Sequence, residues 1–131
     1  MQAAAALDTD AEVPPARPQR PIDLVHLSKF TMGQRDVEAE ILGLFRQQLA
    51  ASLDRLAAAA DLAGDDAAWR EAAHTLKGSA RGVGAWALAD RCQGAEKLAD
   101  GDTRRVAVSE LADLVAAATA FIDELLADWH G

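Results

Sequence analysis

Cysteine, tyrosine and proline are scarce in this sequence, which has one, none and four of them among 131 residues. A single cysteine, Cys92, excludes an internal disulfide and a zinc site built from cysteines. Basic residues are outnumbered, giving a formal net charge of −8, and this argues against nucleic-acid binding, which requires Lys and Arg to neutralise phosphates. Long apolar runs are also missing, and Asp8 and Asp10 interrupt the N-terminal stretch. We therefore expect a cytoplasmic protein with no signal peptide and no membrane span.

Alternating runs of Val, Ile and Thr, which are typical of strands, are absent, whereas Ala and Leu are abundant. Hydrophobic residues make up 50% of the chain, which is enough for one core. Residues 1–21 are rich first in Ala and then in Pro and Arg, with few large apolar side chains, so we predict a disordered tail. Residues 22–131 are predicted to form a single helical domain.

Apolar residues recur at steps of three and four along the domain, which is the spacing of one helix face. The pattern predicts a short helix over about 23–29 and longer helices over about 35–62, 66–83, 85–100 and 103–129. The predicted core residues are Leu24, Leu27, Leu42, Phe45, Leu49, Leu53, Leu56, Trp69, Ala73, Leu76, Ala80, Val83, Ala85, Leu88, Cys92, Ala95, Ala99, Val108, Leu111, Val115, Ala118, Ile122, Leu125 and Trp129.

Helix boundaries are indicated by Gly64 with Asp65 and by Gly101 with Asp102, each pairing a helix stop with a cap for the next helix. A further break near 82–84 is less sharply marked, because the helical pattern nearly continues through it. Short loops place consecutive helices antiparallel. The sequence therefore predicts an all-α fold, an antiparallel up-down four-helix bundle with a short additional N-terminal helix.

His74 lies about 140° from the centre of the apolar stripe on its helix, so its side chain is expected to face solvent. By the same arithmetic, the residues within about 60° of His74 are Arg70, Glu71, Lys77, Gly78 and Arg81. A neutral imidazole is a nucleophile near neutral pH. A lysine one turn further on is suited to the charged oxygens of a phosphoryl group.

Gly78 is hard to justify by helix stability, since glycine inside a helix costs about 1 kcal/mol relative to alanine. Its missing side chain leaves room for another protein's active site beside the imidazole. Arg70 and Arg81 add positive charge to an acidic molecule, which suits an acidic partner. Each feature alone has an ordinary explanation as a solvated surface residue, and the combination carries the prediction.

The strip resembles the signature of histidine-containing phosphotransfer (HPt) domains in the segment His74-Thr-Leu-Lys77-Gly78-Ser79-Ala80, followed by Gly84. The continuation Ala87-Leu-Ala-Asp-Arg-Cys92, with Glu96, is similar to the next helix of that family. The resemblance extends over roughly residues 22–129 in helix order. It implies a monomeric bundle in which His74 is phosphorylated, Lys77 supports the phosphoryl group and Gly78 provides space. Glu96 lies where several members have Gln, and is expected to orient the imidazole, although it would repel a nearby phosphate.

By this resemblance the chain is expected to relay a phosphoryl group from one receiver-domain aspartate to another. Its partners would be the receiver domains of response regulators and hybrid histidine kinases. It is not expected to be a stand-alone enzyme or to hold a metal or cofactor, because Mg²⁺ would come from the receiver. Two alternatives remain open, a receiver- or kinase-binding module that transfers nothing and a sink that drains phosphate from receivers.

Other motif matches lack their structural context. Glu71-x-x-His74 has the spacing of di-metal bundles, but no second such pair exists in the sequence. Gly82-x-Gly84-x-x-Ala87 imitates a dinucleotide fingerprint without a preceding strand. Cys92 falls on an apolar stripe and is expected to be a buried small hydrophobe. A docking surface beside the strip, or else core packing, is predicted for Leu27, Phe30 and Met32.

Overall fold

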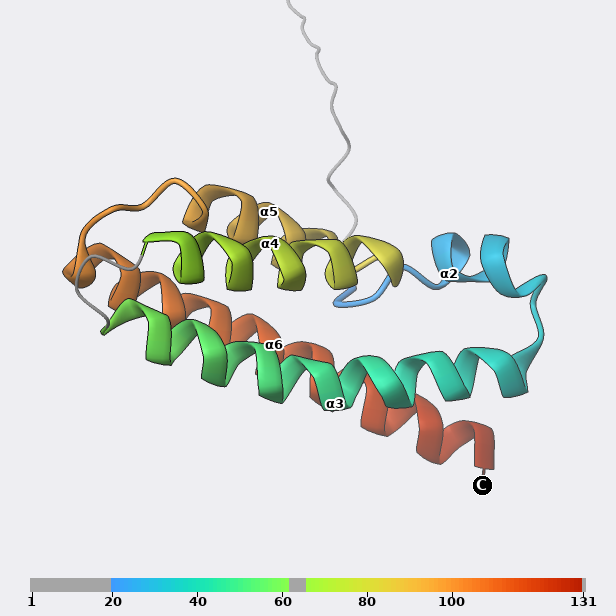
Figure 1. Ribbon diagram of the computed structural model, residues 1–131. Helices are drawn as coiled ribbons and strands as arrows, with labels where there is room; N and C mark the ends of the chain where they lie inside the picture. Colours follow the sequence, from blue (N-terminus) through green and yellow to red (C-terminus); the bar gives the residue numbers. More distant parts are fainter. Residues whose placement is uncertain (1–19, 62–65, 131) are drawn as a thin grey trace, which may run out of the picture.

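The structure is a computed structural model that describes residues 20–61 and 66–130. Within these ranges it contains α-helices and no strands (Figure 1). The helices are α2 (Leu24–Thr31), α3 (Arg35–Ala60), α4 (Asp66–Gly82), α5 (Trp86–Ala95) and α6 (Gly101–His130). The predicted all-α fold is confirmed. The predicted tail, apart from its last two residues, and the predicted Gly64–Asp65 boundary lie outside the described residues.

Four helices form an antiparallel bundle in which each runs opposite to the one before it (Figure 1). α3 packs against α4 and α6, and α5 packs against α4 and α6. The paired helices differ in length, since α3 and α6 have 26 and 30 residues whereas α4 and α5 have 17 and 10. One end of α3 therefore extends beyond α4, and α2 packs against α3 there (Figure 1).

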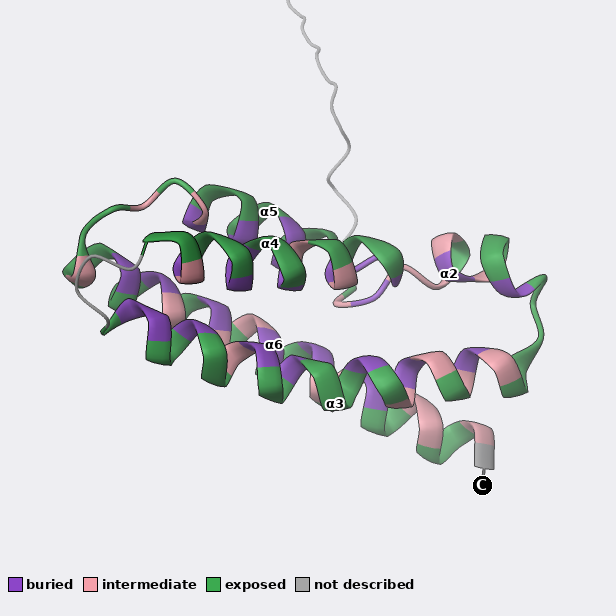
Figure 2. Cartoon of the chain, in the orientation of Figure 1, coloured by how far each residue is buried: buried purple, intermediate pink, exposed green. Residues whose placement is uncertain are grey.

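The core lies along the inward stripes of the four long helices (Figure 2). Leu42, Leu76 and Ile122 are fully buried, as the spacing predicted. Trp69 is also fully buried, and its indole nitrogen donates to the carbonyl of Ala95 at 2.7 Å. Ala99 is exposed, so its assignment to the core was wrong. The reason is that α5 ends at Ala95 instead of continuing to residue 100.

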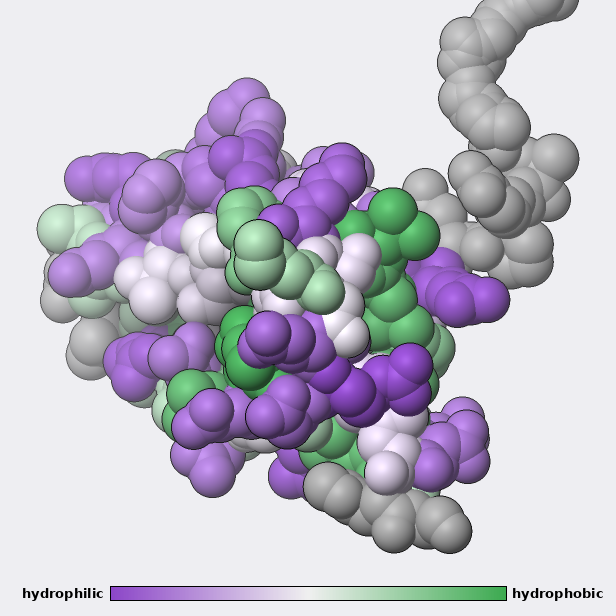
Figure 3. All heavy atoms as spheres, turned by 90° about the vertical axis from the view of Figure 1, so that its right-hand side faces the viewer, coloured by the Kyte–Doolittle hydropathy of each residue, from purple (hydrophilic) through white to green (hydrophobic). Residues whose placement is uncertain are grey.

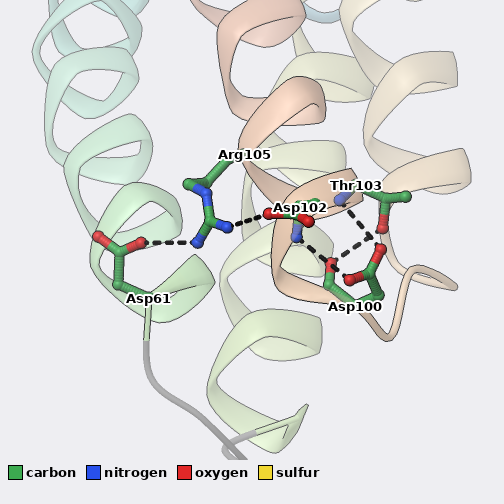
Figure 4. A network of polar contacts seen from close by, with 5 residues as sticks. All are labelled: Asp61, Asp100, Asp102, Thr103 and Arg105. Atoms are coloured by element: carbon green, nitrogen blue, oxygen red, sulfur yellow. Dashed lines mark hydrogen bonds and ion pairs between the residues drawn. The ribbon is translucent and has the colours of Figure 1, made fainter.

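The start of α6 differs from the prediction, because its cap is Asp100 and not Asp102. The Asp100 carboxylate accepts from the backbone N–H groups of Asp102 and Thr103, both at 3.3 Å (Figure 4). These bonds hold the pKa of Asp100 below its usual value. Asp102 instead pairs with Arg105, whose guanidinium also reaches Asp61 at the end of α3 (Figure 4).

The turn between α4 and α5 contacts Asp23, the residue that precedes α2. Gly84 has φ +78°, and a Cβ there would lie 2.7 Å from the Cβ of Asp23. The Gly84 carbonyl accepts from the backbone N–H of Asp23 at 2.9 Å. The indole of Trp86 donates to the Asp23 carboxylate at 3.0 Å, and this bond lowers the pKa of Asp23. Glycine is therefore required where the chain entering α2 crosses the turn.

Arg104 is a buried charge that the apolar pattern did not predict. Its side chain is 4% exposed and its guanidinium pairs with Asp66 at 2.6 Å. Its Nε donates to the carbonyl of Leu98 at 3.0 Å, and the group lies over the ring of Trp69. The guanidinium thus joins the starts of α4 and α6 to the segment after α5.

Candidate functional site

His74 lies in the middle of α4, on the face opposite the core. Its neighbours Ala73 and Leu76 are fully buried, whereas its own side chain is 71% exposed. The outward orientation predicted from the helical spacing is confirmed. An exposed imidazole on a rigid helix is accessible to a second protein.

Glu96 connects His74 to Lys77. It follows the last residue of α5, and its Oε1 lies 3.8 Å from Nδ1 of His74. Its Oε2 lies 2.5 Å from the ammonium of Lys77. That oxygen is shielded from solvent and has no well-aligned hydrogen bond within the described ranges, so the ion pair with Lys77 is its partner. The carboxylate thus occupies the position between the imidazole and the cation.

Lys77 differs from the free surface cation that the helical spacing suggested. Its side chain is 13% exposed and that of Glu96 is 22% exposed. The aliphatic part of the Lys77 side chain is covered by the protein, and its ammonium contacts the Glu96 carboxylate. The other ring nitrogen of His74, Nε2, has no hydrogen bond or ion pair to any described residue. Within the described ranges, Nε2 is therefore the ring nitrogen that remains open to a partner.

Four residues predicted beside the histidine form an open rim. A Cβ built on Gly78 would meet nothing within 4 Å, so this position faces open space. Arg70 and Glu71 are exposed, with no polar partner among the residues that the structure covers. Arg81 is exposed and donates to Oε1 of Gln93 at 2.6 Å.

Two polar side chains that hydrogen-bond to residues of α4 were missed by the sequence analysis. Gln93 on α5 holds Arg81, and Gln48 on α3 lies 3.2 Å from the hydroxyl of Ser79. Gln93 precedes Glu96 by three residues, so helical spacing places it on the same face of α5, and this signal was available. Gln48 carried no such signal, because its position depends on the packing of α3 against α4.

An exposed apolar surface lies at the end of the molecule that carries α2 (Figure 3). Phe30 and Met32 are 69% and 85% exposed, so the core-packing alternative does not hold for them. Leu27 is 1% exposed, so for this residue the core-packing alternative holds. Val25 and Trp86 are further exposed apolar residues, and the ring of His26 contacts the edges of Phe30 and Trp86.

Cys92 is fully buried beneath the Lys77–Glu96 pair. Burial raises the pKa of its thiol to about 12, the Glu96 carboxylate adds to the rise and Lys77 opposes it. The structure confirms the prediction of a buried small side chain. No group of three or more His, Cys, Asp or Glu residues within 20–61 and 66–130 is arranged to hold a metal ion. None of the helices described is both long and apolar enough to cross a membrane.

Comparisons with known proteins agree with the helical bundle and place the chain in a family. The Hpt domain family model matches residues 40–128, and the chain belongs to this family. Among solved structures, histidine-containing phosphotransfer protein B (HptB) from Pseudomonas aeruginosa PAO1 is similar, with a TM-score of 0.71 and 25% sequence identity. The match covers 79% of this chain and 92% of that one. No curated protein sequence matches the chain.

Membership of the family defines the general role of the chain. Hpt domain proteins carry phosphoryl groups in histidine phosphotransfer and are not stand-alone catalysts. They interact with the receiver domains of phosphorelays. The chain therefore functions in histidine phosphotransfer.

Proposed function

We propose that this chain is a phosphorelay intermediate that accepts a phosphoryl group on Nε2 of His74 from one receiver-domain aspartate and passes it to another. The observation that carries the proposal is the environment of the imidazole. The ring is exposed, Nδ1 faces Glu96, and Nε2 is open to a partner. The Nε2 lone pair attacks phosphorus, and the electron pair of the broken P–O bond leaves with the aspartate carboxylate.

Lys77 supports the transferred group. An ammonium has three N–H donors. Within the part of the chain that the structure describes, Lys77 has one fixed carboxylate partner, which leaves donors for phosphoryl oxygens. The remaining electrostatic stabilisation, including Mg²⁺, is assigned to the receiver domain. This chain needs no cofactor of its own for the step.

Gly78 and the charged rim are assigned to partner access. The open space at Gly78 allows the loops of a receiver to approach the imidazole without meeting a side chain. Arg70, Glu71 and Arg81 surround this opening and face the rim of an acidic receiver site. The exposed apolar residues Phe30, on α2, and Met32, directly after it, are assigned to a further docking contact. We propose that the protein presents this surface as a monomer.

Transfer in vitro tests the proposal. The purified chain is mixed with each ³²P-labelled receiver domain of its own cell in the presence of Mg²⁺, next to a His74→Ala variant. Acid-labile, base-stable label is expected on the wild type alone. Label should then pass from the isolated phosphoprotein to a second receiver. Binding without transfer would support the interaction-module alternative, and loss of the label to water in place of a second receiver would support the phosphate sink.

A further inference from the structure

Glu96 places a negative charge beside the imidazole of His74, where an attached phosphoryl group would add two more. It lies 3.8 Å from the imidazole of His74 and 2.5 Å from the ammonium of Lys77. The carboxylate is 22% exposed, so solvent screens it less than a free surface charge. Its electrostatic effect on the imidazole and on an attached phosphoryl group should therefore be strong.

The first effect concerns the proton on Nδ1. When the Nε2 lone pair forms the N–P bond, the proton on Nδ1 stays on the ring, which then carries a positive charge. A carboxylate at 3.8 Å stabilises this protonated ring. When the N–P bond later breaks, its electron pair returns to Nε2 and neutral imidazole leaves, which is a far better leaving group than an imidazolate anion.

The second effect concerns Lys77. Its ammonium is held by Oε2 of Glu96, and the attached phosphoryl group must share the cation with that carboxylate. The two negative groups also repel each other across the short distance. The phosphorylated state gains less from Lys77 than it would beside a neutral residue. Both effects shorten the lifetime of the phosphohistidine.

We propose that Glu96 is a positioning residue that keeps phospho-His74 in a labile, Nδ1-protonated form and so favours rapid onward transfer over storage. The inference rests on the proposed function, and it adds the reactivity of the intermediate. A neutral amide at this position would keep the shape of the side chain and its contact with Lys77 but would remove the charge.

The test compares the lifetimes of phospho-His74 in the wild type and in Glu96→Gln. Both proteins are phosphorylated with phosphoramidate, freed of the reagent and followed at about pH 8 by ³¹P NMR. We expect hydrolysis about tenfold slower in Glu96→Gln. The control is Asp90→Asn, which removes the same charge from an exposed site on α5 and should leave the rate unchanged. Equal rates in wild type and Glu96→Gln, or equal slowing by Asp90→Asn, would overturn the proposal.

A second measurement uses the wild type alone and does not depend on the folding of a variant. In protein labelled with ¹⁵N in histidine, the Nδ1 shift of phospho-His74 at about pH 8 should be that of a protonated nitrogen. The same phosphoprotein unfolded in urea should show an unprotonated Nδ1. An unprotonated Nδ1 in the folded phosphoprotein would contradict the inference. If no receiver labels His74 yet these results hold, the proposed relay fails and the assignment of Glu96 stands.

Discussion

Lys77 and Arg104 are both mostly buried cations, with side chains 13% and 4% exposed, and each pairs with a carboxylate from another part of the chain. Their surroundings differ. The Arg104 guanidinium is held by Asp66 and by the carbonyl of Leu98, and it also lies over the Trp69 ring. The Lys77 ammonium has one fixed partner among the described residues, and beside that partner is an exposed imidazole.

The difference separates a structural charge from one that is available to a ligand. A cation whose donors are directed at fixed protein groups joins elements and stabilises the fold. A cation with spare donors next to an exposed nucleophile can bind the group that the nucleophile receives. Substitutions at the two positions should therefore affect different properties.

The largest effect is expected from Lys77→Met, which should lower the rate of transfer from a phosphorylated receiver about 100-fold. It also leaves the Glu96 carboxylate without its partner, so some loss of stability is expected. The double variant Lys77→Met/Glu96→Gln should recover that stability without recovering transfer. Transfer at the wild-type rate by either variant would show that Lys77 is a structural charge like Arg104.

Arg104→Ala should lower the free energy of unfolding by about 2–3 kcal/mol, measured by urea denaturation. The cost is below that of a fully buried pair, because Asp66 is 51% exposed and can be hydrated. The folded fraction should transfer phosphate as the wild type does. Arg91→Ala is the matched control, since Arg91 and Glu110 form an exposed pair, and it should cost less than about 1 kcal/mol.

Gly84 and Gly78 differ in the same way, since Gly84 is required by the fold and Gly78 is assigned to partner access. Gly84→Ala should cost about 2 kcal/mol, because it combines a positive φ with a clash against Asp23. A thermal melt measures this loss. A melting temperature equal to that of the wild type would show that the turn does not need glycine.

Gly78→Gln should instead stabilise the protein by about 0.5–1 kcal/mol, because this helical position has open space around it. Transfer from a receiver should fall by about tenfold, since the new side chain obstructs the approach. Phosphorylation by phosphoramidate, which needs no docking, should be unchanged. If the small donor and the receiver are slowed equally, the role assigned to Gly78 is wrong.

The smallest effect is expected at Cys92. Because the pKa of the folded thiol is raised to about 12, the thiol should not react with an alkylating reagent near neutral pH. In the unfolded chain the thiol ionises near its ordinary pKa of 9.0, so its contribution to stability is complete below that pH and is lost as pH rises toward 12. Cys92→Ala should remove this part of the alkaline decline in stability.

Local patterns were sufficient to predict the helices and the face that carries His74. The three-and-four spacing defines a buried stripe, and the orientation of His74 follows from its angle to that stripe. The end of α5 and the cap of α6 were less determined, since Asp100 and Asp102 flank Gly101 and both fit a cap. The chain uses Asp100, because α6 begins at Gly101 and Asp102 already lies inside its first turn, where it pairs with Arg105.

Contacts between side chains of different helices could not be predicted from the sequence patterns. The burial of Lys77 against Glu96 depends on how closely α5 packs on α4, which spacing along one helix does not specify. The burial of Arg104 could have been predicted more easily. Arg104 precedes Val108 by four residues and so continues the apolar stripe of α6. A charge on an apolar stripe indicates a buried ion pair.

Mapping the label among the three histidines shows whether His74 is the phosphorylated residue. His26→Asn, His74→Asn and His130→Asn are each incubated with the same phosphorylated receiver and Mg²⁺, and base-stable label is located by mass spectrometry at alkaline pH. We expect full labelling of His26→Asn and His130→Asn and none of His74→Asn. Label retained by a folded His74→Asn variant would show that another residue accepts the phosphoryl group.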